Sequence, residues 1–356
     1  MTEPLRIAIV MTNAEQRGGS ERLLQYLLRR ADKSWQISIA FLEDGPMVTE
    51  ARQLGHRVTV IPAPRFRQLL GTVGCIWALR KWLKIQKPQL VLGWMKKAHI
   101  YSGPAAAGIA PAVWFQHENP GNQGIDRLIH WIRARGVLCC SDMVRKLQQE
   151  VTPGLVAKTV HPCQDVANEP AEEIAWPVPV GQKALVMVCR LQTWKGAHLA
   201  VRALHELRGS SHPDLNLVIV GGAHSLEPDY PATLDAEIAK YGLEEFVHLV
   251  GFQSAPASWM RRADVVVHAS HGEPFGMVVA EAIALGVPVV AARPGGPEEI
   301  VRQGVDGMLW NHPDTNDLAN AIRKAMSLVC QPDSERFGVG AYLAKLQTTL
   351  RGLIST

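Results

Sequence analysis

The chain has 356 residues, enough for two domains of ordinary size, and its 47% hydrophobic and 20% charged residues exclude a disordered polypeptide. No apolar run reaches the ~18–20 residues of a membrane-spanning helix. No basic region precedes an apolar stretch at the start, so we expect no secretory signal and a cytoplasmic location. The six cysteines form no Cys-x-x-Cys pair, which argues against a structural zinc site or a disulfide framework.

Charge is divided unevenly along the chain. Residues 1–160 carry a net charge of +11 and residues 161–356 carry −7, within a total of +4. A basic half joined to an acidic half suggests that one domain meets an anionic partner. No basic-aromatic recognition motif accompanies the positive charge, so we do not expect nucleic acid to be that partner.

The first half of the chain alternates between strand-like and helix-like segments. Apolar runs that do not alternate with period two are typical of parallel strands covered on both faces. Such runs occupy residues 5–11, 35–41, 57–62, 89–94, 112–117 and 137–140. Helical patterns lie between them at 19–30, 69–86 and 98–108. This alternation predicts an α/β domain with a doubly wound parallel sheet.

A proline-rich, acidic stretch without periodicity, residues 162–182, has the composition of a linker. Beyond it the alternation resumes, with apolar runs at 184–190, 215–222, 246–252, 264–270 and 287–292. We therefore predict a domain over 1–165, a second domain over 166–332 and a helical tail within 333–356. Ligands of such sheets bind beyond the carboxyl ends of the strands, so we expect the site in the cleft between the domains.

The most informative part of the sequence contains Glu273 and Glu281, on either side of a predicted turn. A helix is expected to begin near Gly276, and the free amides of Gly276, Met277 and Val278 would form an anion site at its start. A carboxylate before and after an anion site suits a nucleotide sugar, in which a sugar and a ribose flank a diphosphate. The same stretch also fits a helix whose acidic residues are placed favourably against its dipole.

Two further elements point to a phosphate. Arg190 ends a predicted strand and Lys195 begins the next helix, and an arginine fork with a mobile lysine charge suits a diphosphate. Gly18 and Gly19 separate the first strand from its helix, without the Gly-x-Gly-x-x-Gly pattern of nicotinamide-cofactor sites. Taken alone, the first element also fits two solvated cations and the second a simple turn.

Together these elements resemble the group 1 family of retaining glycosyltransferases (glycosyltransferase family 4), which have the GT-B fold. The family's motifs appear as the E-x7-E pair Glu273 and Glu281, the Arg-x4-Lys pair Arg190 and Lys195, and the glycine loop Gly18-Gly19. The resemblance is dense over residues 184–329 and thinner over 5–165. It implies two Rossmann-like domains facing each other across a cleft, with the last helix crossing back to the N-terminal domain.

The resemblance implies a nucleotide-diphosphate sugar as co-substrate, with a UDP-sugar expected ahead of a GDP-sugar. Arg190 and Lys195 then neutralise the diphosphate, which Gly18 and Gly19 approach from the N-terminal domain. Glu281 accepts hydrogen bonds from the ribose hydroxyls.

The transferred sugar is assigned to a second group of residues by the same resemblance. These are Glu273 and the backbone of Phe275, Gly276 and Met277. His117, at the end of a predicted strand, matches the family's active-site histidine near that sugar. A histidine packed at a strand end would give the same pattern.

The implied reaction moves a hexose-type sugar to a hydroxyl of a glycan, a lipid-linked molecule or a small metabolite, with retention of configuration. No Asp-x-Asp motif is present, so we expect the cations to replace a metal ion in stabilising the leaving diphosphate. Front-face attack is the favoured account, and double displacement through Glu118 is its competitor. The alternatives are a GT-B epimerase or hydrolase, which would turn over the donor without an acceptor, and a non-catalytic nucleotide-sugar-binding protein.

Two features bear on the acceptor. Lys96 and Lys97 follow a predicted strand and suit a phosphate or carboxylate, although two exposed lysines would look the same. Residues 65–87 combine an apolar stripe with basic residues: Leu69, Val73, Ile76, Leu79 and Leu83, with Arg80, Lys81, Lys84 and Lys87 elsewhere around the helix. Such a helix can lie on an anionic membrane to reach a lipid-linked acceptor, or can pack its stripe on the sheet.

Overall fold

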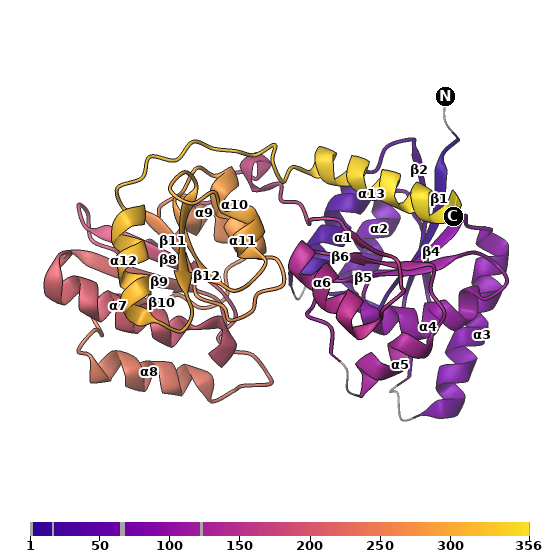
Figure 1. Cartoon of the computed structure of the whole chain (residues 1–356), viewed down its shortest axis with the longest axis horizontal. Helices are drawn as coiled ribbons and strands as arrows, with labels where there is room; N and C mark the ends of the chain where they lie inside the picture. The colour runs from indigo at the N-terminus through magenta and orange to yellow at the C-terminus, as the bar shows by residue number, and fades with distance from the viewer. Residues whose placement is uncertain (1–2, 16–17, 65–67, 122–123, 356) are drawn as a thin grey trace. The chain divides into compact units, whose positions relative to one another are not determined.

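The structure is a computed structural model of the whole chain, and it describes residues 3–15, 18–64, 68–121 and 124–355. The chain forms two compact units (Figure 1). The first combines Met1–Cys163 with Val339–Thr356, and the second is Gln164–Gly338. The boundaries predicted from the sequence are 165/166 and 332/333.

Within its described residues, the first unit is built on a seven-stranded parallel sheet in the order β3-β2-β1-β4-β5-β6-β7. Its strands are β1 (Leu5–Met11), β2 (Trp35–Phe41), β3 (Arg57–Val60), β4 (Leu90–Gly93), β5 (Ala112–Gln116), β6 (Gly136–Cys139) and β7 (Ala157–Thr159). These runs are apolar because both faces of the sheet are covered: from Ile7 to Met11 no residue of β1 is more than 1% exposed. The strand order reverses between β1 and β4.

Helices connect these strands. They are α1 (Gly19–Arg30), α2 (Pro46–Gln53), α3 (Leu69–Gln86), α4 (Lys96–Ala106), α5 (Ile125–Trp131) and α6 (Asp142–Val151). The last helix of the chain, α13 (Val339–Ser355), returns to this unit and packs beside α1 (Figure 1). Its buried residues, among them Tyr342, Leu346 and Leu350, recur at helical spacing, so one side of the helix packs on the rest of the first unit.

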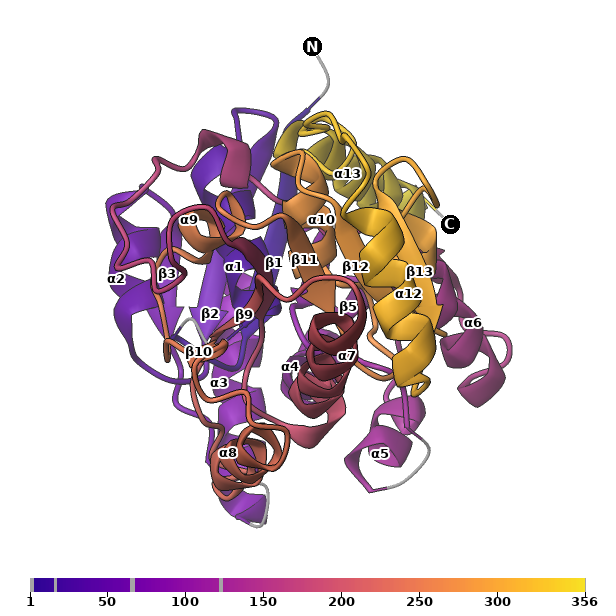
Figure 2. The ribbon, with the colours of Figure 1, turned by 90° about the vertical axis from the view of Figure 1, so that its left-hand side faces the viewer.

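The second unit, all of whose residues are described, has a six-stranded parallel sheet in the order β10-β9-β8-β11-β12-β13. Its strands are β8 (Lys183–Val188), β9 (Leu215–Val220), β10 (Val247–Leu249), β11 (Val265–His268), β12 (Val289–Arg293) and β13 (Gly307–Asn311). Its helices are η1 (Val166–Asn168), η2 (Thr193–Lys195), α7 (Ala197–Ser210), α8 (Tyr230–Lys240), α9 (Pro256–Met260), α10 (Met277–Ala284), α11 (Pro297–Ile300) and α12 (Thr315–Ala325). Helices α7 and α12 pack together over one face of the sheet (Figure 2).

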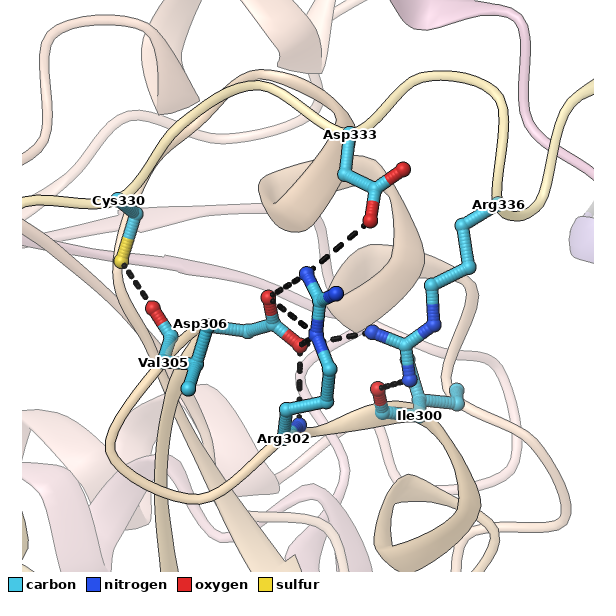
Figure 3. A network of polar contacts seen from close by, with 7 residues as sticks. All are labelled: Ile300, Arg302, Val305, Asp306, Cys330, Asp333 and Arg336. Atoms are coloured by element: carbon cyan, nitrogen blue, oxygen red, sulfur yellow. Dashed lines mark hydrogen bonds and ion pairs between the residues drawn. The ribbon is translucent and has the colours of Figure 1, made fainter.

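An ion network fixes the segment that leaves the second unit toward α13 (Figure 3). Asp306 is only 4% exposed, and its carboxylate accepts hydrogen bonds from Arg302, at 2.6 Å, and Arg336, at 2.7 Å. Arg302 also donates to Asp333 at 3.0 Å, and Arg336 donates to the Ile300 carbonyl. Burial alone would raise the pKa of Asp306, but these guanidinium groups lower it.

The prediction of two doubly wound parallel α/β domains is confirmed. Strands β7 and β13 were not predicted, because their sequences, AKT and GMLWN, carry no apolar run of the expected length. The predicted tail helix begins only at Val339, and residues 333–338 belong to the second unit. That the two domains face each other across a cleft remains a prediction.

Helix α3 has the predicted bounds, but the predicted apolar stripe is wrong in part. The buried residues are Cys75, Leu79, Trp82 and Leu83, whereas Val73 is 64% exposed and Trp77 is 59% exposed. The helix packs against α4, and its buried side is therefore the one that carries Cys75 and Trp82. Residues 65–67 and the side chain of Leu69 lie outside the described part of the chain.

Candidate active site

In the second unit, the predicted donor residues gather where the strand order reverses. Arg190 and Lys195 follow β8, and Glu273 follows β11, the strand next to it in the sheet. This is the edge at which ligands of open α/β sheets bind. Residues that are far apart in the sequence therefore lie at the same edge of the sheet, because neighbouring parallel strands end there.

Lys195 and Glu273 form an ion pair. Lys195 Nζ lies 2.7 Å from Glu273 Oε2, and both side chains are 15% exposed. His268, the last residue of β11, places its Nε2 3.3 Å from the same carboxylate oxygen. Burial alone would raise the pKa of Glu273, but Lys195 and His268 together lower it well below its usual range. Glu273 is therefore a carboxylate at any physiological pH.

The turn that carries Lys195 is fixed at both ends. At its start, Glu227 accepts hydrogen bonds from Thr193 N at 2.8 Å and from Thr193 Oγ1 at 2.6 Å. At its end, Gly196 has a φ of 74°, and a side chain there would meet the Ala269 carbonyl at 2.4 Å. The Lys195 ammonium also lies 3.9 Å from the centre of the Trp194 ring. Lys195 is thus pre-positioned beside Glu273.

The E-x7-E stretch forms a loop followed by helix α10, as its spacing predicted. Gly276 has a φ of 102°, which disfavours any other residue, and α10 begins at Met277 with Val278 in its first turn. Glu281 lies one turn further on and is 3% exposed. Phe275 is 4% exposed and packs edge-on against Phe337, so its ring belongs to the core of the unit.

Sequence reasoning missed two supports of this loop. His268 lies within an apolar run of the sequence, which gives no sign that its side chain contacts Glu273. Gly296 donates from its backbone to the Glu273 carbonyl at 2.7 Å, and a side chain at Gly296 would meet the Pro274 carbonyl at 2.4 Å. The Gly-Gly sequence at 295–296 was the available signal for this close approach.

In the first unit, the glycine loop is less constrained than expected. Gly18 has a φ of −174°, extended backbone that any residue adopts, and among the described residues a side chain there would meet Glu21 Oε2 at 3.5 Å. Gly19 begins α1. The buried carboxylate of Glu21 accepts a hydrogen bond from Asn13 at 3.0 Å, so the segments on both sides of the loop are joined. Approach of Gly18 and Gly19 to a diphosphate remains a prediction.

His117 follows β5 and lines a pocket with residues that follow β1 and β4. Among the lining residues are Thr12, Asn13, Met95, Lys96 and Gln116. The imidazole stacks on Phe115, with ring centres 4.1 Å apart, and burial lowers its pKa to about 4. Its Nε2 has no hydrogen-bond partner among the described residues. His117 is therefore neutral and has a ring nitrogen available beside the pocket.

Lys96 is not the exposed lysine of the alternative interpretation, and its contact with an acceptor remains a prediction. Its side chain is 15% exposed and pairs with Glu118 and Asp126, both at 2.8 Å. Its charge is therefore already balanced by the chain's own carboxylates. Lys97, the next residue, is exposed. Asp126 was not predicted, because it stands on a separate helix, α5, with no motif around it.

No group of three or more His, Cys, Asp or Glu residues is arranged to hold a metal ion within the described part of the chain. None of the described helices has the length and hydropathy needed to cross a lipid bilayer.

Two family models match this chain, one within each of the two units for most of its length. The model of "Glycosyl transferases group 1" matches residues 169–342, and that of "Glycosyltransferase Family 4" matches residues 17–156. With the two parallel α/β units, these matches define a GT-B glycosyltransferase architecture. The chain belongs to the group 1 glycosyltransferases, glycosyltransferase family 4.

Curated relatives match over part of their length. D-inositol 3-phosphate glycosyltransferase of Arthrobacter sp. (strain FB24) is 38% identical over 148 residues, which are 41% of this chain and 34% of that protein. Glycogen synthase of Mycobacterium tuberculosis (strain CDC 1551 / Oshkosh) is 28% identical over 243 residues, which are 64% of this chain and 56% of that protein. The chain thus spans about a third to a half of these relatives.

Solved structures match over nearly the whole chain. HepE of Anabaena, crystallised with UDP and glucose, superposes with a TM-score of 0.80 at 22% identity, over 98% of this chain and 99% of that one. A glycosyltransferase from Rickettsia africae gives a TM-score of 0.82 at 17% identity, over 99% of each chain. At such identities the likeness establishes the fold alone.

Proposed function

We propose that the chain is a retaining glycosyltransferase that moves a hexose-type sugar from a nucleotide-diphosphate sugar to an acceptor hydroxyl. The observation that carries this proposal is the Lys195–Glu273 ion pair at the edge where β8 and β11 end, the edge at which Arg190 also follows β8. A fixed cation beside an ionised carboxylate suits a substrate that carries both phosphate charge and sugar hydroxyls. Family membership gives the reaction class.

Arg190 and Lys195 stabilise the diphosphate as it leaves, with the amides at the start of α10. Glu273, held as a carboxylate, accepts a hydrogen bond from a hydroxyl of the transferred sugar. The backbone of Phe275, Gly276 and Met277 completes that subsite. Glu281 binds the ribose. Each role needs charge or hydrogen-bonding groups that are fixed before the substrate binds.

A UDP-sugar is the donor that we propose to test first. HepE, a neighbour in fold, was crystallised with UDP and glucose, and this supports testing a uridine nucleotide before the others. The proposal includes independence from divalent metal, since two side-chain cations supply the positive charge that a metal would otherwise bring to the leaving group.

Retention is proposed to follow front-face attack, in which the departing phosphate takes the proton of the acceptor hydroxyl. His117 is neutral, with a ring nitrogen available, and is assigned to a hydroxyl of the transferred sugar rather than to proton transfer. Glu118 is engaged with Lys96, which makes it a poor nucleophile for the competing double displacement.

For the acceptor, we propose a surface-bound, lipid-linked molecule reached by docking of α3 on an anionic membrane. One face of α3 carries Leu70, Val73 and Trp77, which are 90%, 64% and 59% exposed, followed by Lys81 and Lys84. These five residues, the α3 stripe, recur three or four positions apart and so share one side of the helix. Apolar side chains beside lysines are typical of a helix lying on an anionic bilayer.

Donor screening tests the proposal. Nucleotide release from a panel of UDP- and GDP-sugars is measured with and without cell-envelope extract, and the anomeric configuration of the product is read by NMR. We expect one donor whose turnover depends on added acceptor. Rapid turnover without any acceptor would instead favour a hydrolase or epimerase, and tight binding without turnover would favour a non-catalytic binding protein.

A further inference from the structure

The loop after β9 brings a histidine to Arg190. Arg190 NH1 lies 3.2 Å from His224 Nε2. On the other side of the imidazole, Leu226 N donates a hydrogen bond to His224 Nδ1 at 3.2 Å. The ring is therefore held between a guanidinium group and a backbone amide of its own turn.

The two contacts cannot both be hydrogen bonds. A neutral imidazole has one N–H and one acceptor nitrogen, and a guanidinium group has only donors. The Leu226 amide is fixed by the backbone of the turn, whereas the Arg190 side chain is exposed, so we assign the acceptor to Nδ1 and the proton to Nε2, the atom that faces Arg190. Two donors thus point toward the same space. An anionic oxygen placed between them would accept from both and would turn an unfavourable contact into two charge-assisted hydrogen bonds.

This arrangement is fixed by backbone pairing. Cys189 N donates to the Val220 carbonyl and Leu191 N donates to the Gly222 carbonyl, both at 2.9 Å, so the segment carrying Arg190 runs beside the one leading to His224. The turn itself closes through Glu227 N, which donates to the His224 carbonyl at 2.9 Å.

Glu227 joins that turn to the second cation. Its carboxylate accepts from Thr193 N and Oγ1, at the start of the turn that ends in Lys195. His224, Arg190 and the Lys195 turn therefore hold their relative positions through main-chain and carboxylate contacts before any ligand binds.

We propose that His224 is a third ligand of the donor diphosphate, donating from Nε2 to an anionic oxygen that it shares with Arg190. The inference rests on the proposed function, which brings a diphosphate to Arg190. It adds a residue that neither the sequence motifs nor the family resemblance pointed to.

Two matched variants test the inference. In His224→Asn the amide oxygen takes the position of Nδ1 and keeps the bond from Leu226 N, but no donor remains at Nε2. In His224→Gln the longer side chain returns an N–H to the Nε2 position. By calorimetry we expect His224→Asn to bind UDP about tenfold more weakly, the range for a hydrogen bond to a charged group, and His224→Gln to recover most of that loss.

Uridine, which lacks the phosphates, separates a phosphate contact from general damage to the site. We expect both variants to bind uridine like the wild-type protein. Wild-type affinity of His224→Asn for UDP would overturn the inference, and so would an equal loss of uridine and UDP binding.

The wild-type protein is first titrated with UDP, GDP and ADP, and the tightest of them, with its nucleoside, replaces UDP and uridine in the comparison. If the wild-type protein binds none of them, the proposed function fails and the inference falls with it. If it binds one and His224→Asn binds that nucleotide equally well, only the inference fails.

Discussion

Lys195 and Glu273 are 78 positions apart in the chain, yet their charged atoms lie 2.7 Å apart in the second unit. The pair joins the loop after β8 to the loop after β11. It gives Glu273 a stable negative charge, because the nearby ammonium lowers the pKa of a carboxyl group that burial alone would raise. A carboxylate so held does not act as an acid, and it suits the proposed role of accepting a hydrogen bond from a hydroxyl of the transferred sugar.

Removal of either cation is expected to slow sugar transfer. Lys195→Ala and Arg190→Ala should each lower kcat by ~10²–10³-fold, the range for losing one preorganised electrostatic contact with the leaving group. The measurement is nucleotide release under saturating donor. Lys183→Ala, at the opposite end of β8, is the matched control and should transfer sugar normally. A double variant, Arg190→Ala with Lys195→Ala, that keeps near-wild-type transfer would contradict the assignment.

Chelation provides a second prediction. If side-chain cations carry the charge of the leaving diphosphate, turnover should be unchanged in excess EDTA. The same assay is repeated after addition of Mg²⁺ or Mn²⁺ to the chelated enzyme. Loss of turnover with EDTA, restored by either ion, would mean that a metal ion binds the diphosphate.

Much of the fold could be predicted because parallel strands buried on both faces leave long apolar runs. The runs at 5–11 and 35–41 coincide with β1 and β2, and the helical pattern at 19–30 coincides with α1. The convergence of Arg190, Lys195 and Glu273 also followed, since ligands collect where parallel strands end.

The partners of these residues could not be predicted. His268 lies inside an apolar run, and Asp126 and Glu227 stand in unrelated segments, so nothing in their spacing connects them to Glu273, Lys96 or Thr193. Their contacts depend on loop conformation, which follows from close packing of the backbone rather than from periodicity. The exposed face of α3 was missed for a similar reason, because periodicity identifies a stripe without identifying the neighbour that covers it.

The ion network around Asp306 predicts a loss of stability. Asp306→Asn should lower the free energy of unfolding by about 1–3 kcal/mol at pH 7, since it removes a buried carboxylate that accepts charged hydrogen bonds from Arg302 and Arg336, whose side chains are 48% and 24% exposed. Urea unfolding measures the change in the free energy of unfolding. Asp235→Asn, at an exposed position of α8, is the control and should leave that free energy unchanged.

The pH dependence of the same variant checks the cause. A carboxyl group whose folded pKa is lowered stabilises the fold above its unfolded pKa of ~3.9, and this contribution is lost as the pH falls through the folded pKa. The difference between Asp306→Asn and the wild-type protein should therefore be constant at neutral pH and shrink in acid. A difference independent of pH would point to lost packing instead of lost charge.

The buried histidine His99 predicts a second effect of pH on stability. Here burial, and not a charged partner, lowers the pKa. It is fully buried and stacked on Trp114, and burial lowers its pKa from 6.5 to about 4. As the pH falls below 6.5, the unfolded chain takes up a proton that the folded chain does not. This histidine should therefore reduce stability by about 1.4 kcal/mol per pH unit until pH 4. His99→Asn should remove that slope, whereas His205→Asn, at an exposed position, should leave it unchanged.

The α3 stripe predicts membrane binding that depends on both lipid charge and apolar contact. Wild-type protein should co-sediment with liposomes that contain anionic lipid, and binding should weaken as salt rises, because each lysine near such a surface contributes ~1 kcal/mol and is screened within ~10 Å. Lys81→Glu with Lys84→Glu should abolish binding. Arg80 is left intact, since it donates to the Ala105 and Ala107 carbonyls and supports the fold.

The apolar half of the stripe is tested separately, because charge alone could attract any basic protein to anionic lipid. Leu70→Ser, Val73→Ser and Trp77→Ser together should weaken binding even at low salt, since they remove the side chains that enter the interface. Val180→Ser with Val329→Ser removes exposed apolar surface from the second unit and is the matched control. Nucleotide release from the donor should be unchanged in all these variants. If the wild-type protein ignores anionic liposomes at low salt, the stripe has no membrane role, and Lys97 becomes the residue to mutate for a soluble anionic acceptor.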